Sequence, residues 1–233
     1  MGRVTPPDDS VAADRALHDD AIVIDALPRE PAQPGALRAH AGGRGGHGQL
    51  TITLADGVDF RRMLDEIQRI DRLLAEHADL VRRVRSVADI RAARREQRVG
   101  IIDGFQNAIH FERNMRRVAP LRELGVLIVP LPYTIANLLA DGCLEPRNAG
   151  LTFFGRALVD ELNRLGVLVD LWPVGDRSAL EAIDHSAAPV AMTHANCHGL
   201  GASPRNKIDE AIRTLARRGG VIGFTRLPAS VSR

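Results

Sequence analysis

Four polar side chains stand beside short apolar runs of the chain, where β/α proteins commonly carry their chemistry. Asp103, Tyr133 and His194 each close or follow such a run, and Arg205 lies in the polar loop after the last of them. Functional groups gather at the carboxyl ends of parallel strands. We therefore expect these four side chains to meet at one end of a sheet.

The residue types indicate a metal ion or a carboxylate as the ligand. Carboxylate and imidazole groups bind zinc, so Asp103 and His194 are candidate metal ligands. The planar fork of Arg205 suits a bidentate contact with a carboxylate, and the Tyr133 phenol can donate a hydrogen bond. Structural alternatives stay open for all four: a helix cap, a structural histidine, a loop arginine paired with an acid, and a tyrosine packed in the core.

The elements that must position these residues alternate between strand and helix. Short apolar runs predict strands at Ala21–Asp25, Leu50–Leu54, Val99–Asp103, Val126–Leu131, Val167–Leu171, Val190–Thr193 and Val221–Phe224. Helical spacing predicts helices over about 58–84, 109–124, 153–165, 176–186 and 209–217. Thr152 and Gly166 are the expected cap and stop of the third helix. The alternation predicts an α/β fold with about seven parallel strands.

Residues 28–49 have a composition that cannot build a packed element. The segment consists almost wholly of Ala, Gly, Pro, Arg, His and Gln, and Leu37 is its only large apolar residue. We expect Arg29–Gln49 to be irregular and exposed. A frameshifted or mis-assembled gene is the alternative, because GC-rich DNA read out of frame yields this composition.

The overall composition is that of an ordinary globular protein. The chain has 233 residues, of which 45% are hydrophobic and 26% charged, and its formal net charge is +2. These values fit a single domain over residues 1–233 and indicate neither a nucleic-acid nor a membrane partner. No apolar run approaches the roughly 20 residues of a membrane span. Cys143 and Cys197 fit two reduced thiols in a cytoplasmic protein.

The stretch Gly150–Asn206 resembles the renal (membrane) dipeptidase family in three linked motifs. These motifs read GLTxFGRxLVxELNRLGVLVDL, then APVxxTHxN, then PRN. The likeness continues to about Phe224 and reaches back more weakly to about Val99. It implies a TIM-barrel-like (β/α)8 fold, here incomplete, because family members continue for roughly a hundred residues that supply the last strand.

The resemblance also implies an activity and a role for each candidate residue. The family hydrolyses dipeptides with a water held between two zinc ions. Asp103 stands at the position of a glutamate that bridges the two metal ions, and His194 matches a metal-binding histidine. Tyr133 takes the place of a histidine that polarises the substrate, and Arg205 matches the arginine that binds the substrate carboxylate.

Several other ligand positions depart from the family pattern. Leu27, Arg29 and Pro173 stand where the family has metal-binding side chains, and none of the three can coordinate zinc. We therefore expect weak or absent zinc binding and little or no dipeptidase turnover. Three hypotheses stay open: a divergent metallohydrolase, a non-catalytic relative that binds small carboxylates, and a truncated or frameshifted gene product. The expected partner is a small molecule such as a dipeptide, with a homodimer left open.

Overall fold

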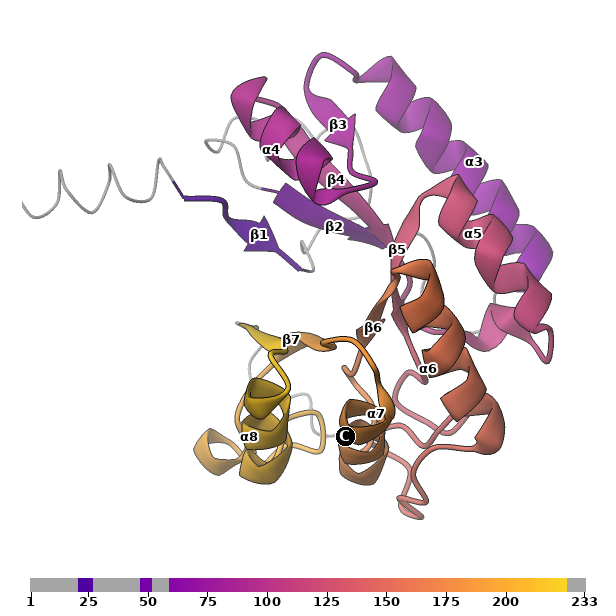
Figure 1. Cartoon of the computed structure of the whole chain (residues 1–233), viewed down its shortest axis with the longest axis vertical. Helices are drawn as coiled ribbons and strands as arrows, with labels where there is room; N and C mark the ends of the chain where they lie inside the picture. Colours follow the sequence, from indigo (N-terminus) through magenta and orange to yellow (C-terminus); the bar gives the residue numbers. More distant parts are fainter. Residues whose placement is uncertain (1–20, 27–46, 52–58, 226–233) are drawn as a thin grey trace, which may run out of the picture.

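The backbone of the protein is described by a computed structural model over residues 21–26, 47–51 and 59–225. Its strands are β1 Ile24–Asp25, β2 His47–Thr51, β3 Val81–Arg83, β4 Val99–Gly104, β5 Val126–Pro130, β6 Leu168–Asp170, β7 Ala191–Ala195 and β8 Val221–Phe224. They form one sheet in the order β1-β2-β4-β5-β6-β7-β8, with β3 paired to β4. All the described strand pairs are parallel (Figure 1). The predicted α/β fold with about seven parallel strands is confirmed.

Helices connect the strands and cover one face of the sheet. They are α3 Phe60–Glu76, α4 Val87–Arg95, α5 Val118–Leu124, α6 Phe153–Leu165, α7 Asp176–His185 and α8 Asp209–Arg217. Figure 1 shows α3, α5 and α6 side by side along the outer side of the strands. Short 3-10 turns lie at Ile109–Phe111, Met115–Arg117 and His198–Leu200.

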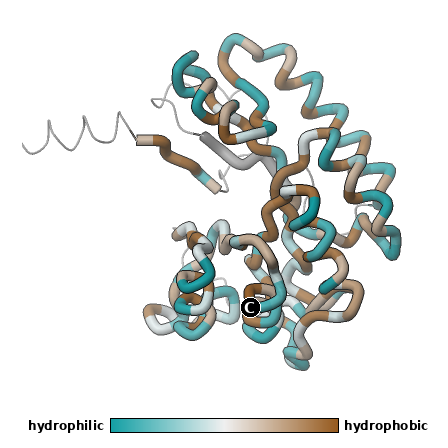
Figure 2. Tube along the Cα trace, viewed as in Figure 1, coloured by the Kyte–Doolittle hydropathy of each residue, from teal (hydrophilic) through white to brown (hydrophobic). Residues whose placement is uncertain are grey.

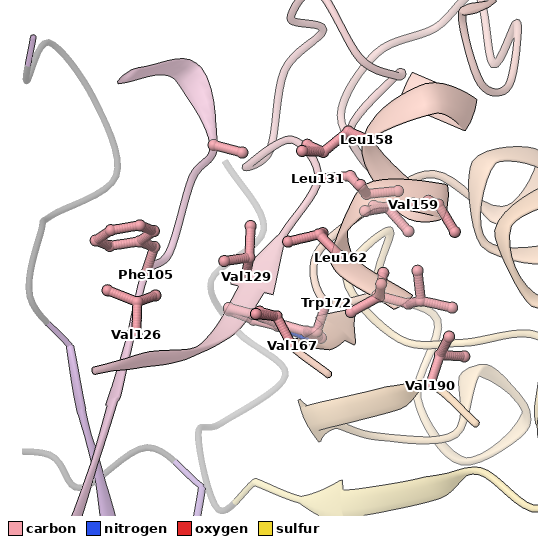
Figure 3. Close-up of a cluster of buried hydrophobic side chains, with 14 of the residues drawn as sticks. Phe105, Val126, Val129, Leu131, Leu158, Val159, Leu162, Val167, Trp172 and Val190 are labelled. Carbon is pink, nitrogen blue, oxygen red and sulfur yellow. The ribbon is translucent and has the colours of Figure 1, made fainter. Parts of the chain in front are cut away.

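The core lies between the sheet and this helical layer. Leu158, Val159 and Leu162 of α6 are fully buried and belong to one large apolar cluster with Val129 of β5 and with Val167, which directly precedes β6 (Figure 3). The hydropathy colouring shows the central strands as mainly hydrophobic, whereas hydrophilic and hydrophobic residues alternate along the helices (Figure 2). Burying each of these large side chains stabilises the fold by about 1.5–3 kcal/mol.

Several predicted boundaries agree with the structure because local signals set them. The Thr152 hydroxyl caps α6 by accepting a hydrogen bond from the Gly155 N–H at 2.9 Å. Gly166 ends the same helix in the left-handed region, with φ of 65°. The predicted bounds of α8 and β8 are those observed.

The predicted helix over 58–84 is wrong after Glu76. The helix α3 ends at Glu76, and Val81–Arg83 form the strand β3 beside β4. Val81 and Val84 are buried, and two arginines lie between them. The burial of these valines favours a strand, although the composition of the segment is typical of a solvated helix. The helix α4, which follows, was not predicted.

The predicted helix over 109–124 is also too long. Only α5 is α-helical, and two 3-10 turns precede it. Glu112 has a φ of 52°, which an α-helix cannot contain. Pro120 lacks an N–H and is tolerated in the first turn of a helix, so it fits a helix that begins at Val118 rather than a longer one.

The prediction that Arg29–Gln49 is irregular, which was made from composition, is wrong for the last three residues of that segment. Residues 47–49 belong to β2, which pairs with both β1 and β4. The predicted strand Leu50–Leu54 therefore begins three residues earlier, at His47. Residues 29–46 and 52–54, and with them most of the predicted irregular segment, lie outside the described residues.

The two ends of the strand order approach each other. A Cβ atom built on Gly223 of β8 would lie 3.9 Å from the Cβ of Ala26, just after β1. No described hydrogen-bonded pairing joins β1 to β8, so the described sheet is an open part of a barrel. Within the described ranges, no helix has the length and apolar character needed to cross a membrane. Cys143 and Cys197 are both free thiols.

Candidate functional site

Three of the four predicted site residues gather around Trp172, the only tryptophan of the chain. Tyr133 follows β5, Trp172 follows β6, His194 lies in β7, and Arg205 belongs to the connection between β7 and α8. The rings of Trp172 and His194 have centroids 3.6 Å apart, and those of Tyr133 and Trp172 lie 6.3 Å apart edge to face. The carboxyl ends of three neighbouring strands thus contribute to one cluster.

Arg205 lies against both aromatic rings. Its Nη2 atom donates a hydrogen bond to the Tyr133 hydroxyl at 3.2 Å, and its guanidinium carbon lies 4.7 Å from the centroid of Trp172. The Nε atom is buried and has no hydrogen-bond partner in the described part of the chain. Among described residues, no acidic side chain forms an ion pair with Arg205. The guanidinium therefore keeps donor capacity for a ligand.

The loop that carries Arg205 is anchored by a buried lysine. Lys207 is fully buried, and its Nζ donates a hydrogen bond to the backbone oxygen of Val174. Its backbone N–H also donates to the Asn196 oxygen at 2.8 Å. Burial lowers the pKa of Lys207 to about 8. Two residues before this anchor, Arg205 is held close to the end of β7.

A chain of hydrogen bonds leads from β6 to the His194 ring. The buried Oδ1 of Asp170 accepts hydrogen bonds from the backbone N–H groups of Trp172 at 3.2 Å and Thr193 at 3.0 Å. Its Oδ2 accepts from the Thr193 hydroxyl at 2.6 Å, and that hydroxyl lies 2.7 Å from His194 Nδ1. The other ring nitrogen of His194, Nε2, is buried without a partner among the described residues.

The electrostatic environment sets the charge state of this chain. Burial raises the pKa of Asp170 to about 6, and hydrogen bonds from Thr193 and the Trp172 N–H oppose the rise. Burial and the neighbouring Arg205 guanidinium lower the pKa of His194 to about 3. Near neutral pH, Asp170 is therefore mainly a carboxylate and His194 a neutral imidazole.

Asp103 has a separate set of contacts. Its carboxylate is buried, and Arg83 Nε lies 3.0 Å from its Oδ2; the same arginine pairs with Asp71 of α3. Neither oxygen of Asp103 accepts an aligned hydrogen bond from a described residue, and burial raises the pKa of this carboxyl to about 7 against the attraction of Arg83. No described contact joins Asp103 to Tyr133, His194 or Arg205.

The described residues do not fit a two-zinc centre. A catalytic zinc ion normally has three protein ligands, drawn from imidazole, carboxylate and thiolate groups. Within the described ranges, no three His, Cys, Asp or Glu side chains are placed to hold a metal ion together. Pro173 offers no donor atom, and Leu27 and Arg29 lie outside the described residues. Asp103 and His194 are thus two separate candidate donors.

The sequence prediction overlooked the roles of three residues in this site. Trp172 contacts both Arg205 and His194, while Asp170 and Thr193 form the hydrogen-bonded chain to the imidazole. One signal was visible in the sequence, since an aspartate and a threonine close two successive apolar runs. A buried polar side chain at such a position needs a hydrogen-bond partner, and Asp170 and Thr193 are partners of each other.

Comparison with known proteins places the chain among peptidases. A model of the family described as membrane dipeptidase (peptidase family M19) matches residues 41–233. Dipeptidase tcpJ from Claviceps purpurea is 27% identical over 179 residues, which are 75% of this chain and 42% of that protein. The chain thus spans less than half the length of this curated relative.

Solved structures show the same fold. An amidohydrolase from Pseudomonas aeruginosa matches with a TM-score of 0.81 and 36% identity, over 90% of this chain and 64% of that one. A metallo peptidase from Rhodobacter sphaeroides, liganded with a phosphinate mimic of the dipeptide L-Ala-D-Ala, matches with a TM-score of 0.74 over 93% of this chain and 70% of that one. Its identity of 16% shows a common fold alone.

Proposed function

The chain belongs to the membrane dipeptidase family, a family of metallopeptidases, and from this premise we propose that it binds small carboxylate ligands of the dipeptide class at Arg205. The same proposal includes weak zinc binding and little or no hydrolysis of the bound ligand. It describes a family member that keeps the substrate-binding part of the site while its metal-binding part has diverged.

The observation that carries this proposal is the environment of Arg205. Its guanidinium lies against Trp172, is oriented by the Tyr133 hydroxyl, and keeps a buried Nε–H without a described partner. A buried donor without an acceptor costs about 1–3 kcal/mol, which a carboxylate ligand would recover. The Tyr133 hydroxyl accepts from Arg205 and keeps its own proton to donate to the same ligand.

The metal part of the proposal concerns Asp103 and His194. As the two candidate zinc ligands, they would provide fewer donors than the three that a catalytic zinc ion normally has. Asp103 also lies beside Arg83, whose positive charge disfavours a cation at that carboxylate. Zinc as the metal, a cytoplasmic location, one domain over the whole chain and a homodimeric assembly stay predictions.

A weak zinc-dependent amide hydrolase is the second candidate function. The buried His194 Nε2 without a described partner favours it, since a neutral imidazole nitrogen is a good zinc ligand. The amidohydrolase from Pseudomonas aeruginosa, at 36% identity, also favours it. A metal centre would then need donors from outside the described residues.

Fluorescence of Trp172 tests the carboxylate-binding proposal directly. The chain has no other tryptophan, and this ring contacts Arg205, so a ligand at the guanidinium should change the emission. We expect saturable titration with dipeptides, and an affinity at least about tenfold weaker in Arg205→Gln because a charge-assisted hydrogen bond is lost. Arg205→Lys should recover only part of it, since lysine lacks the planar fork.

The control for this titration is Arg213→Gln on the exposed surface of α8. Arg213 pairs with the exposed Asp209 four residues earlier, so its replacement removes the same charge away from the site. We expect wild-type affinity in this variant. Unchanged dipeptide affinity in Arg205→Gln would show that Arg205 does not bind the carboxylate.

A further inference from the structure

The hydrogen bonds around Thr193 determine which nitrogen of the His194 ring carries the proton. The Thr193 hydroxyl has one hydrogen, and the buried Asp170 carboxylate takes it at 2.6 Å. Towards His194 Nδ1, at 2.7 Å, the same hydroxyl oxygen can then only accept. A neutral imidazole has one N–H, so a proton on Nδ1 leaves a lone pair on Nε2.

We propose that Asp170 and Thr193 are positioning residues that hold His194 as its Nδ1–H tautomer, so that Nε2 faces the site as a hydrogen-bond acceptor. Asp170 is suited to this role because its Oδ1 already accepts two backbone N–H groups, which fix the orientation of the carboxylate.

This assignment deepens the proposed function and rests on it for the class of ligand. Among the described residues, neither the Arg205 Nε–H nor the lone pair of His194 Nε2 has a hydrogen-bond partner, and both groups lie beside Trp172. A ligand that satisfies both carries a carboxylate together with an N–H or O–H donor. Dipeptides and N-acylated amino acids have both groups, whereas a simple carboxylate has one.

The variant Asp170→Asn reverses the direction of the hydrogen bonds that lead to His194, while asparagine keeps the shape of the aspartate side chain. The amide oxygen of the substituted side chain must take the place that accepts the two backbone N–H groups, so the amide nitrogen replaces Oδ2. That nitrogen donates to the Thr193 hydroxyl, which then directs its own hydrogen to His194 Nδ1. The ring proton moves to Nε2, and the acceptor in the site becomes a donor.

Long-range proton–nitrogen NMR of the ¹⁵N-labelled chain reads the tautomer directly. The chain has eight histidines, and His194→Gln identifies the signals of His194 by their loss. We expect the wild-type ring near neutral pH to show a protonated Nδ1 and an unprotonated Nε2, and Asp170→Asn to show the reverse. A protonated Nε2 in the wild type, or an unchanged pattern in Asp170→Asn, would overturn the assignment.

Three further variants separate this role from a merely structural one. Thr193→Ser keeps the hydroxyl and should keep the wild-type pattern, while Thr193→Val keeps the shape and should give a mixture of both tautomers. Asp141→Asn changes another buried aspartate, which pairs with Arg147, and should leave the His194 signals unchanged. Loss of the wild-type pattern in Thr193→Ser would contradict the proposed role of the Thr193 hydroxyl.

Two small ligands test the ligand class through Trp172 fluorescence. N-acetylglycine has a carboxylate and an amide N–H, and N-acetylsarcosine is the same molecule with a methyl group on that nitrogen. We expect N-acetylglycine to bind the wild type about tenfold more tightly, the effect of one hydrogen bond to a buried acceptor. The preference should disappear in Asp170→Asn, where Nε2 is a donor.

The outcomes distinguish the inference from the function on which it rests. Equal affinities of the wild type for the two ligands would overturn the proposed ligand class. An unchanged preference in Asp170→Asn would overturn it too, because the preference would then come from steric exclusion of the methyl group. Binding of neither ligand would contradict the proposed carboxylate-binding function and the ligand class together. In every case the NMR pattern alone decides the tautomer of His194.

Discussion

At the scale of single residues, the site depends on two buried nitrogen atoms. Arg205 Nε is a donor without a described acceptor, and His194 Nε2 is an acceptor without a described donor. Buried polar atoms are usually paired, so unpaired ones around one aromatic ring indicate a ligand position. Asp103 differs, because its carboxylate lies against Arg83 and away from that ring.

A buried histidine outside the site gives a prediction about pH. His110 is 1% exposed, and burial, with a smaller effect of Arg117, lowers its pKa from 6.5 to about 4. The unfolded chain therefore binds a proton between about pH 6.5 and 4 that the folded chain does not. We expect the free energy of unfolding to fall by up to about 3 kcal/mol across this range because of His110.

The variant His110→Leu isolates this effect, since leucine does not titrate and fits an apolar environment. Urea unfolding at several pH values, followed by Trp172 fluorescence, should show a smaller loss of stability on acidification in the variant than in the wild type. Other titrating groups act in both proteins and cancel in the difference. Parallel curves for the two proteins would show that folding leaves the pKa of His110 unchanged and would contradict this prediction.

At the scale of elements, the helix α6 links the core to the site. The Thr152 hydroxyl caps this helix and donates a hydrogen bond to the Leu138 oxygen at 2.7 Å, and Thr152 N–H donates to the Leu139 oxygen at 2.8 Å. The start of α6 is therefore fixed against the segment that follows β5, which carries Tyr133. Gly155 allows this close approach.

The substitution Gly155→Ala tests that packing. A Cβ atom at position 155 would lie 2.1 Å from the Leu139 backbone oxygen, which cannot move without moving the loop. Helix propensity alone would favour alanine by about 1 kcal/mol. We expect instead a loss of about 2–3 kcal/mol in the free energy of unfolding, because overpacking outweighs propensity.

The matched control for this substitution is Ala157→Gly on the exposed side of α6. It replaces alanine by glycine, the reverse of the first substitution. Helix propensity alone should lower the free energy of unfolding of this variant by about 1 kcal/mol. Both variants can be measured by urea unfolding. A stabilising Gly155→Ala would show that the loop adjusts and that glycine is not needed there.

The sequence predicts elements well where a cap or a stop marks their ends. Thr152 and Gly166 defined α6, and the apolar spacing of 209–217 defined α8. The strand β3 was missed because two of its three residues are arginines, so that only tertiary burial of Val81 reveals it. Ser86, which caps α4 with the Asp89 N–H, was a usable signal that the arginines around it obscured.

At the scale of the whole molecule, the parallel strand order explains which site residues could be predicted to meet. Neighbouring strands β5, β6 and β7 bring Tyr133, Trp172 and His194 to one edge, as expected for carboxyl ends of parallel strands. The face on which a side chain lies is harder to predict in a strand buried on both sides. Asp103 lies on the same face of β4 as Ile101 and Phe105, which pack in the large cluster below the helices.

The chemistry of the site was predictable only in part. Arg205 and His194 could be named from the motifs, but the acceptor state of His194 depends on Asp170 and Thr193, which belong to two different strands. Spacing along the chain does not show such a contact, because the two residues are 23 positions apart and a whole helix, α7, lies between them. The register of β6 against β7 creates it.

Zinc-dependent hydrolysis is the most direct measurement of the central claim, that the chain binds carboxylates without a working zinc centre. The assay follows cleavage of a panel of dipeptides by the 233-residue chain in excess zinc, beside His194→Ala. Circular dichroism establishes that both proteins are folded. We expect the wild type to hydrolyse the panel no faster than His194→Ala or zinc in buffer. Zinc-dependent turnover that is lost in His194→Ala would contradict the account and identify the chain as an active dipeptidase.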